Sequence, residues 1–420
     1  MAAAAAVVAA AAAAAGNAGN RQTILDSSTH RASVDSVEPT GARGAPSGEP
    51  KQYPYSVLNC TFLLVVHLTA LVGGGLYVLK HGVTFGIVGL TAIWTFLTIL
   101  SLSAGYHRLF SHKTYEAHPI FRGLLLAFGA AAFQNSAITW AADHRRHHKQ
   151  VDTDDDPYNA RRGFWYSHIG WVLRQTEPAH EVYPVPDLWR DPLIRWQHKI
   201  YMLIGSVFGF VLPTLAAWLL LNDALGGLLI AGAFRIMFVW HVTFSINSFA
   251  HIVGSQPYSD RNTSRDSLFT AFLSLGEGYH NFHHTFPVDY RNGVRVRDFD
   301  PSKWTIRAAS LVGLARNLRR TPKAIVLRAR LRMEARTLEK QPVPAPLRER
   351  LDRIKAELEQ RLARWHTLAG RFEALRDRGE VRARRIRRRL QVTIRHVRRD
   401  LRVAQQAWRE AVRAAQMEIA

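Results

Sequence analysis

The chain contains very little cysteine and comparatively few acidic residues. Cys60 is the single cysteine among 420 residues, and 33 Asp and Glu stand against 55 Lys and Arg. One thiol excludes an intramolecular disulfide, a CxxC zinc site and a thiolate-bound iron–sulfur cluster. A metal centre in this chain must therefore use other ligands.

The first 54 residues lack the features of an export signal and of a folded domain. The Ala-rich run from Met1 to Ala15 has no basic residue before it, and no clear cleavage pattern follows it. Ala, Ser, Gly and Pro dominate from Gly16 to Pro54, and this composition buries too little apolar surface to fold alone. We therefore predict a disordered tail over residues 1–54.

Four long apolar runs occupy the middle of the chain. Each is about as long as the ~20 residues with which a helix crosses a bilayer, and together they cover roughly residues 56–80, 83–105, 197–221 and 225–250. A further apolar stretch, Ile120 to Trp140, predicts a shallow or amphipathic segment because polar residues interrupt it, namely Arg122, Gln134 and Asn135. The sequence thus predicts an all-α membrane protein made of two tight helical hairpins.

Positive charge predicts the orientation of these hairpins. Eleven Lys and Arg residues lie between the second and third runs, whereas the short connections within the hairpins offer only Lys80. Loops rich in Lys and Arg remain on the cytoplasmic side of a membrane. We therefore expect a multi-pass integral membrane protein with both termini and the long central loop in the cytoplasm.

Nine of the 19 histidines fall in four tight groups. The groups are HRLFSH with His107 and His112, HRRHH with His144, His147 and His148, NSFAH with His251, and HNFHH with His280, His283 and His284. Every group lies at the cytoplasmic end of a predicted span or in the loops beyond it, as one buried site near the membrane surface requires. Isolated histidines are interpreted as packing or surface residues, with His241 in the fourth span as the first candidate for an exception.

The spacing within each group predicts how the imidazoles are presented. Residues at i, i+3 and i+4 share one face of a helix, so each HxxHH group can direct three rings at one point. His107 and His112 would lie ~140° apart on an ideal helix, so we predict that the helix ends near Tyr106 or His107 and that His112 follows in a turn. Asn247 precedes His251 by one helical turn and lies on the same side.

The number of histidines indicates a pair of metals. Imidazole binds iron, zinc, copper and nickel, so the ligand type alone leaves the metal open. Nine ligands exceed the three or four of a single zinc and divide into four or five for each of two ions. Activating oxygen against an unactivated C–H bond requires a redox metal, which favours two irons. Asp143 and Glu277 are candidate acceptors for ring N–H groups.

These groups resemble the membrane acyl-CoA desaturase family, which includes the stearoyl-CoA desaturases. The matching segments are GYHRLFSHKTYEAHP, WAADHRRHHKQVDTDDDPYNARRGFWYSHIGW, NSFAH and GEGYHNFHHTFPVDYR. The resemblance implies four transmembrane helices with a cytosolic cap that holds two irons. Position by position, it implies that the nine histidines are iron ligands and that Asn247 contacts one iron through water. The implied reaction is O2-dependent introduction of a cis double bond into a long-chain acyl thioester, at the ninth carbon by family default.

The resemblance also suggests substrates and partners. Arg161, Arg162 and Arg174 are candidates for an anionic headgroup, although each also fits the role of a cytoplasmic loop cation. Ala142 stands where many animal relatives have Arg, so acyl-CoA is favoured while acyl-carrier protein and phospholipid remain open. The chain lacks an HPGG haem motif, so electrons must come from a separate cytochrome b5, ferredoxin or rubredoxin with its reductase.

A basic arm follows the predicted desaturase domain of residues 55–315. Residues 316–420 carry 30 Lys and Arg against 12 Asp and Glu, a net charge of +18 out of +22 for the chain. Apolar residues recur at alternating spacings of four and three on both sides of Gly379, which predicts two amphipathic helices beyond the prolines at 342–346. These helices could lie on anionic lipid, pair as a coiled coil or dock an acidic partner. A membrane tether argues against nucleic acid as the target, despite the run RARRIRRRL.

Two other functions fit parts of the pattern. A membrane di-iron hydroxylase shares the histidine plan and differs in returning oxygen to the lipid chain. A non-catalytic lipid-binding scaffold would be expected to show decayed histidine groups, whereas these are complete.

Overall fold

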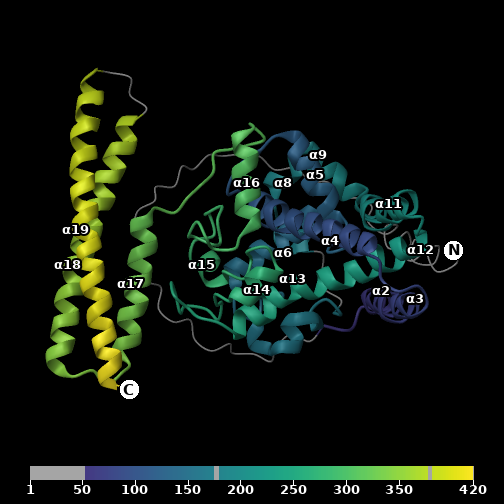
Figure 1. Cartoon of the computed structure of the whole chain (residues 1–420), viewed down its shortest axis with the longest axis horizontal. Helices are drawn as coiled ribbons and strands as arrows, with labels where there is room; N and C mark the ends of the chain where they lie inside the picture. Colours follow the sequence, from purple (N-terminus) through teal and green to yellow (C-terminus); the bar gives the residue numbers. More distant parts are fainter. Residues whose placement is uncertain (1–52, 175–178, 377–380, 420) are drawn as a thin grey trace. The chain divides into compact units, whose positions relative to one another are not determined.

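The computed structural model describes residues 53–174, 179–376 and 381–419 (Figure 1). The predicted tail therefore lies almost wholly outside the described residues. Helices make up most of the described chain, and two short strands, β1 (Glu116–Ala117) and β2 (Ala315–Arg316), pair as a small sheet. The chain divides into two compact units. Unit 1 comprises residues up to 111 together with 117–248, and unit 2 comprises residues 112–116 together with those from 249 onward.

Four helices are long and apolar enough to cross a membrane, in agreement with the four predicted spans. They cover Val57–His81, Phe85–Ser111, Tyr201–Leu221 and Ala224–Ile252. Each span is one continuous helix that contains a π-helical stretch. The first span consists of α2 (Val57–Leu68), η1 (Thr69–Gly73) and α3 (Gly74–His81), and the second of α4 (Phe85–Leu100) and η2 (Ser101–Ser111). The third consists of α10 (Tyr201–Ser206), η5 (Val207–Val211) and α11 (Leu212–Leu221), and the fourth of α12 (Ala224–Gly226), η6 (Gly227–Phe234) and α13 (Arg235–Ile252). The chain is an integral membrane protein.

Local signals explain where the first two spans begin. The side-chain oxygens of Ser56 and Thr84 accept hydrogen bonds from the backbone N–H groups of Asn59 and Ile87. These caps satisfy donors that the first turn of a helix otherwise leaves unpaired. Gly82 follows the first span with a positive φ of 73°, a backbone conformation that glycine adopts without steric cost.

The second span corrects one prediction. Its helix does not end near Tyr106 or His107 but continues through the π-helical segment η2 to Ser111. In a π-helix each turn is closed by i→i+5 hydrogen bonds, so the 3.6-residue geometry used for the prediction does not apply. His112 comes directly after the last residue of this helix.

A buried arginine forms hydrogen bonds to several helices inside unit 1. Arg235 at the start of α13 is fully buried and donates to the carbonyl oxygens of Ala231, Ala131 and Gly209 and to the hydroxyl of Thr98. Carbonyl acceptors from several elements thus surround a guanidinium that has five donors to satisfy. This network joins the second, third and fourth spans to the segment that follows α5.

Short helices connect the second and third spans. They are α5 (Pro119–Ala130), α6 (Ala137–Gln150), η3 (Ala160–Arg162), η4 (Tyr166–Gly170), α7 (Ala179–Val182), α8 (Pro186–Trp189) and α9 (Pro192–Lys199). The apolar stretch from Ile120 breaks between α5 and α6, where Phe133 and Asn135 adopt positive φ. The prediction that this stretch does not cross the membrane agrees with the structure.

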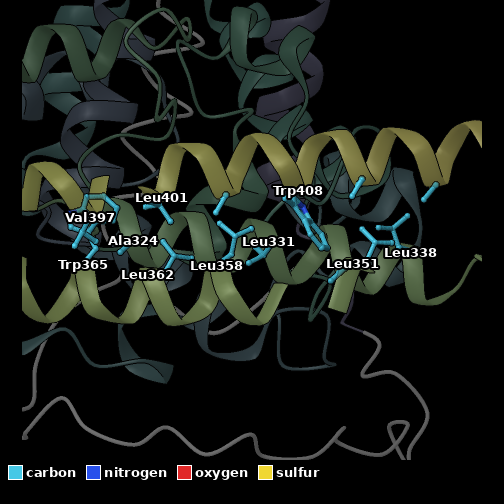
Figure 2. Packing of buried hydrophobic residues seen from close by; sticks show 14 of the residues in the cluster. Ala324, Leu331, Leu338, Leu351, Leu358, Leu362, Trp365, Val397, Leu401 and Trp408 are labelled. Carbon is cyan, nitrogen blue, oxygen red and sulfur yellow. The ribbon is translucent and has the colours of Figure 1, made fainter. Parts of the chain in front are cut away.

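The later part of unit 2 consists of small helices followed by a helical arm. The small helices are α14 (Leu268–Leu273), α15 (His280–Thr285) and α16 (Pro301–Leu311), and the arm contains α17 (Lys323–Glu339), α18 (Ala345–Arg376) and α19 (Val381–Ile419). The two predicted amphipathic helices are present as α18 and α19, and α17 adds a third. The three arm helices share one buried apolar cluster that includes Leu331, Leu358 and Leu401 (Figure 2).

Candidate metal centre

Unit 1 brings three of the predicted ligands together. His107 belongs to η2, while His144 and His148 lie one turn apart on α6. Each of the three offers a ring nitrogen, and these atoms lie within 4.8 Å of one another. The ring centroids of His107 and His144 are 4.5 Å apart, and those of His144 and His148 are 4.7 Å apart. Because His107 and His144 are buried, this set can surround an ion with little exposure to water.

His147, on the same helix, is oriented by an aspartate that the sequence reasoning missed. Its Nδ1 lies 2.8 Å from Oδ1 of Asp156, and the Asp156 carboxylate also accepts the backbone N–H groups of Asp152 and Tyr158. A carboxylate accepts only, so Nδ1 of His147 carries the hydrogen and Nε2 has its lone pair available for a metal. The acidic run DTDDD after the second histidine group was the available signal.

Unit 2 brings a second set together. His280 and His284 lie one turn apart on α15, and His251 lies near the end of α13. The Nε2 atom of His280 is 3.1 Å from Nε2 of His251 and 3.0 Å from Nε2 of His284. Nδ1 of His251 is 2.8 Å from the hydroxyl of Thr263, which holds the ring while Nε2 points at its neighbours. Three Nε2 atoms directed at one point are a suitable ligand set for a transition metal.

The remaining two predicted ligands are also neighbours within unit 2. The rings of His112 and His283 have centroids 4.6 Å apart, and ring nitrogens of the two lie within 4.8 Å of each other. His283 is buried on α15 between His280 and His284. Eight of the nine histidines of the sequence groups therefore have ring nitrogens close to those of another candidate ligand within their own unit, and the ring centroid of His147 is 5.6 Å from that of His148.

The two predicted acidic acceptors occupy different surroundings. Burial raises the pKa of Asp143 to about 7, and the nearby Arg146 guanidinium partly opposes this effect by lowering the pKa. Glu277 is buried, and its Oε2 accepts a hydrogen bond of 2.8 Å from the side chain of Asn292. The backbone N–H of Asn292 in turn donates to Asp300. Their contribution to orienting metal ligands stays a prediction, as does that of Asn247, which lies partly buried on α13.

The three candidate headgroup arginines are found in two places. Arg161 and Arg162 share the short helix η3, and the Arg162 guanidinium lies 3.8 Å from the ring centre of Tyr166. Arg174 instead stacks on Tyr55 at 4.0 Å and donates to the carbonyl oxygen of Tyr53. Arg161 is exposed, so it is the most accessible of the three to an anionic group.

Unit 1 also contains a chain of three imidazoles that sequence reasoning did not find. Nε2 of His67 is 3.0 Å from Nε2 of His241, Nδ1 of His241 is 3.0 Å from Nε2 of His168, and Nδ1 of His168 is 3.0 Å from the hydroxyl of Ser248. The sequence marked only His241 as a possible exception, and His168 was overlooked because it stands alone between aromatic residues.

The contact at one end of this series of imidazoles determines which ring nitrogens carry a hydrogen. Nδ1 of His67 lies 2.7 Å from the carbonyl oxygen of Leu63, and a carbonyl can only accept. When all three imidazoles are neutral, His241 therefore donates a hydrogen bond to His67, and His168 donates one to His241. The pKa of His168 is lowered to about 4, mainly by burial and to a smaller extent by the neighbouring His241. The backbone carbonyl of Phe244 acts in the opposite direction and raises this pKa. His168 is therefore neutral at pH 7.

The fold and these histidines define a class: an integral membrane protein with candidate imidazole ligands at the ends of its spans and in the segments beyond them. Residues 83–299 match the family model described as fatty acid desaturase. The chain is 47% identical over 224 residues to "Probable acyl-CoA desaturase" of Schizosaccharomyces pombe, a match that covers 53% of this chain and 47% of that protein. It is 44% identical over 242 residues to acyl-CoA desaturase 1 of Saccharomyces cerevisiae, covering 57% and 48%.

An animal relative matches over more of its own length. The chain is 38% identical over 246 residues to stearoyl-CoA desaturase 5 of Bos taurus, covering 56% of this chain and 73% of that protein. The chain belongs to the fatty acid desaturase family, as its histidine groups predicted. It spans about half the length of the two fungal relatives.

Proposed function

We propose that this protein is an O2-dependent acyl-CoA desaturase that introduces a cis double bond into a long-chain acyl group. The observation that carries the proposal is the convergence of the Nε2 atoms of His251, His280 and His284 in a member of this family. The overall reaction removes two hydrogens from the chain and reduces O2 to two waters, with two electrons and two protons supplied from outside. Desaturation at the ninth carbon is the family default, and one relative, fat-5 of Caenorhabditis elegans, is named a Delta(9)-fatty-acid desaturase.

The nine histidines would hold two irons. The mostly buried, imidazole-only donor sets of both units fit redox-active transition metals, because neutral imidazole is a common ligand for iron. When bound, the irons supply the oxygen-activating chemistry. The protein's own residues hold and orient the ligands, and we infer that Asn247 acts through water and that Asp143, Glu277 and Asp156 act through hydrogen bonds to ligand rings.

The substrate is proposed to be the coenzyme A thioester. The relatives are named for acyl-CoA, and Arg161 and Arg162 place two cations on one short helix where phosphate groups could be bound. Acyl-carrier protein and phospholipid are the competing carriers, since Ala142 lacks the charge of an arginine. The acyl chain itself would enter the apolar interior of unit 1.

Electron supply and orientation complete the proposal. Electrons would come from a separate cytochrome b5, ferredoxin or rubredoxin with its reductase. Both termini would face the cytoplasm, because the Lys and Arg residues concentrate between the second and third spans. Residues 55–315 would form the catalytic domain, and residues 316–420 would be an accessory arm.

Product analysis tests the reaction directly. The full chain and its His283→Ala variant would be expressed in cells whose lipids are then analysed by mass spectrometry. We expect fatty acids with two hydrogens fewer only with the unaltered chain. Products with an added oxygen atom would show a hydroxylase instead, and unchanged lipids in the presence of a competent electron donor would refute the proposal and favour a scaffold.

A further inference from the structure

We propose that the helical arm contains a binding site for a ligand that carries two or more phosphate groups beside an apolar or aromatic portion. The site is a cavity of about 880 Å³ lined by α17, α18 and α19. It lies beyond residue 299, where the match to the family model ends. Its ligand chemistry follows from the charge and from the aromatic and apolar surface of the lining.

The cavity concentrates positive charge. Five cations line it, namely Lys323, Arg395, Arg398, Arg399 and Arg402, and no carboxylate is among its described lining residues. The four arginines follow one another at i, i+3, i+4 and i+7 on α19, so they project from one side of that helix. None of the five forms an ion pair with another described residue, although such pairs occur elsewhere in the arm, for example between Arg330 and Glu334.

Like charges at this spacing repel one another, so the cluster is unfavourable for the folded arm by itself. An anion in the cavity removes that repulsion. Arginine guanidinium groups present paired N–H donors that match the oxygens of a phosphate. Several arginines on one helix face therefore favour a ligand with more than one phosphate group over a single carboxylate.

An aromatic ring lies beside the cationic group. Trp365 on α18 lines the cavity and is 8% exposed. The guanidinium of Arg398 lies 5.4 Å from the centre of the same ring, which joins the indole to the cationic group.

The rest of the lining is apolar. Leu327, Val392 and Leu401 complete the wall, and the volume is large enough for more than an inorganic ion. Two sources offer the required chemistry: a soluble phosphorylated nucleoside and the headgroup of a phosphorylated lipid. Both present several phosphate oxygens next to an aromatic or apolar part.

Binding should be measured on the full protein in zwitterionic nanodiscs. A first experiment titrates adenosine 3′,5′-bisphosphate into the protein and follows binding by calorimetry. A second experiment measures association of the protein with vesicles that contain a phosphatidylinositol bisphosphate. We expect one of the two probes to bind. Replacing Arg398 and Arg402 by Gln should weaken that binding by about tenfold or more, because charge-assisted hydrogen bonds are lost.

A second double variant separates the site from general charge. Arg388→Gln with Arg413→Gln removes the same charge from exposed α19 positions outside the cavity and should change the dissociation constant by less than about threefold. Equal losses in both double variants, binding of neither probe, or tighter binding of duplex DNA at the same arginines would overturn the proposal.

Discussion

Nδ1 of His147 lies 2.8 Å from Oδ1 of Asp156, and both side chains are almost fully buried. This contact fixes the ring of a proposed metal ligand and leaves Nε2 directed away from the carboxylate. A ligand imidazole whose other nitrogen donates to a carboxylate is oriented in advance and is more basic toward the metal.

Replacing this carboxylate should weaken metal binding while the fold is retained. Asp156→Asn is nearly isosteric but removes the negative charge, so we expect a loss of about 10- to 100-fold in iron affinity. The measurement is iron retained after dialysis against a graded chelator series. Asp155→Asn, at an exposed neighbouring carboxylate, is the matched control and should behave like the unaltered protein. Equal iron retention in both variants would refute the orienting role.

Asn247 should affect turnover more than metal content. We infer that it contacts iron through water, so Asn247→Ala should lower the desaturation rate and leave most of the iron in place. Metal analysis and product formation on the same preparation test this expectation. Iron loss as complete as that caused by His251→Ala would instead make Asn247 a direct ligand.

His168 should make the protein sensitive to acid. Its pKa is lowered in the folded state from 6.5 to about 4, so between these values the unfolded chain binds the proton and the folded chain does not. Stability should therefore fall as the pH decreases from about 6.5 toward 4. The unfolding midpoint at pH 7 and pH 5 measures the effect. His168→Gln should show a smaller drop between the two pH values, and an identical drop would contradict the assignment.

The arm should be dispensable for chemistry. A chain ending at Pro322 removes α17, α18 and α19 together, so the shared apolar cluster is not cut open, and it keeps the hydrogen bond from Thr321 to Asp289. We expect this shortened protein to bind iron and to desaturate when electrons are supplied artificially. Loss of iron on removal of the arm would place the arm within the catalytic fold.

Much of this architecture was predictable from local sequence patterns. Four apolar runs of bilayer length predicted the membrane spans, and the HxxHH spacing predicted the helix faces on which His144 and His280 lie. Both predictions depend only on residues close together in the sequence. The helix α17 was not predicted because its buried positions, such as Ala324 and Ala335, include small residues whose apolar signal is weak.

Features that depend on turns and distant contacts could not be predicted. Asp156 reaches His147 because the chain turns back after α6, with Asp152 in a left-handed conformation. The continuation of the second span to Ser111 depends on π-helical hydrogen bonding, which leaves no hydropathy signature. The imidazole chain joins His67, His168 and His241 across elements far apart in sequence, so no spacing rule would group them.

Metal analysis of the purified full-length protein tests the central claim most directly. If the nine histidines hold a pair of irons, elemental analysis should find two irons per chain, and His147→Ala or His283→Ala should lower the iron content and the desaturase activity together. One equivalent of zinc per chain with no iron, in protein that forms unsaturated product, would contradict the account.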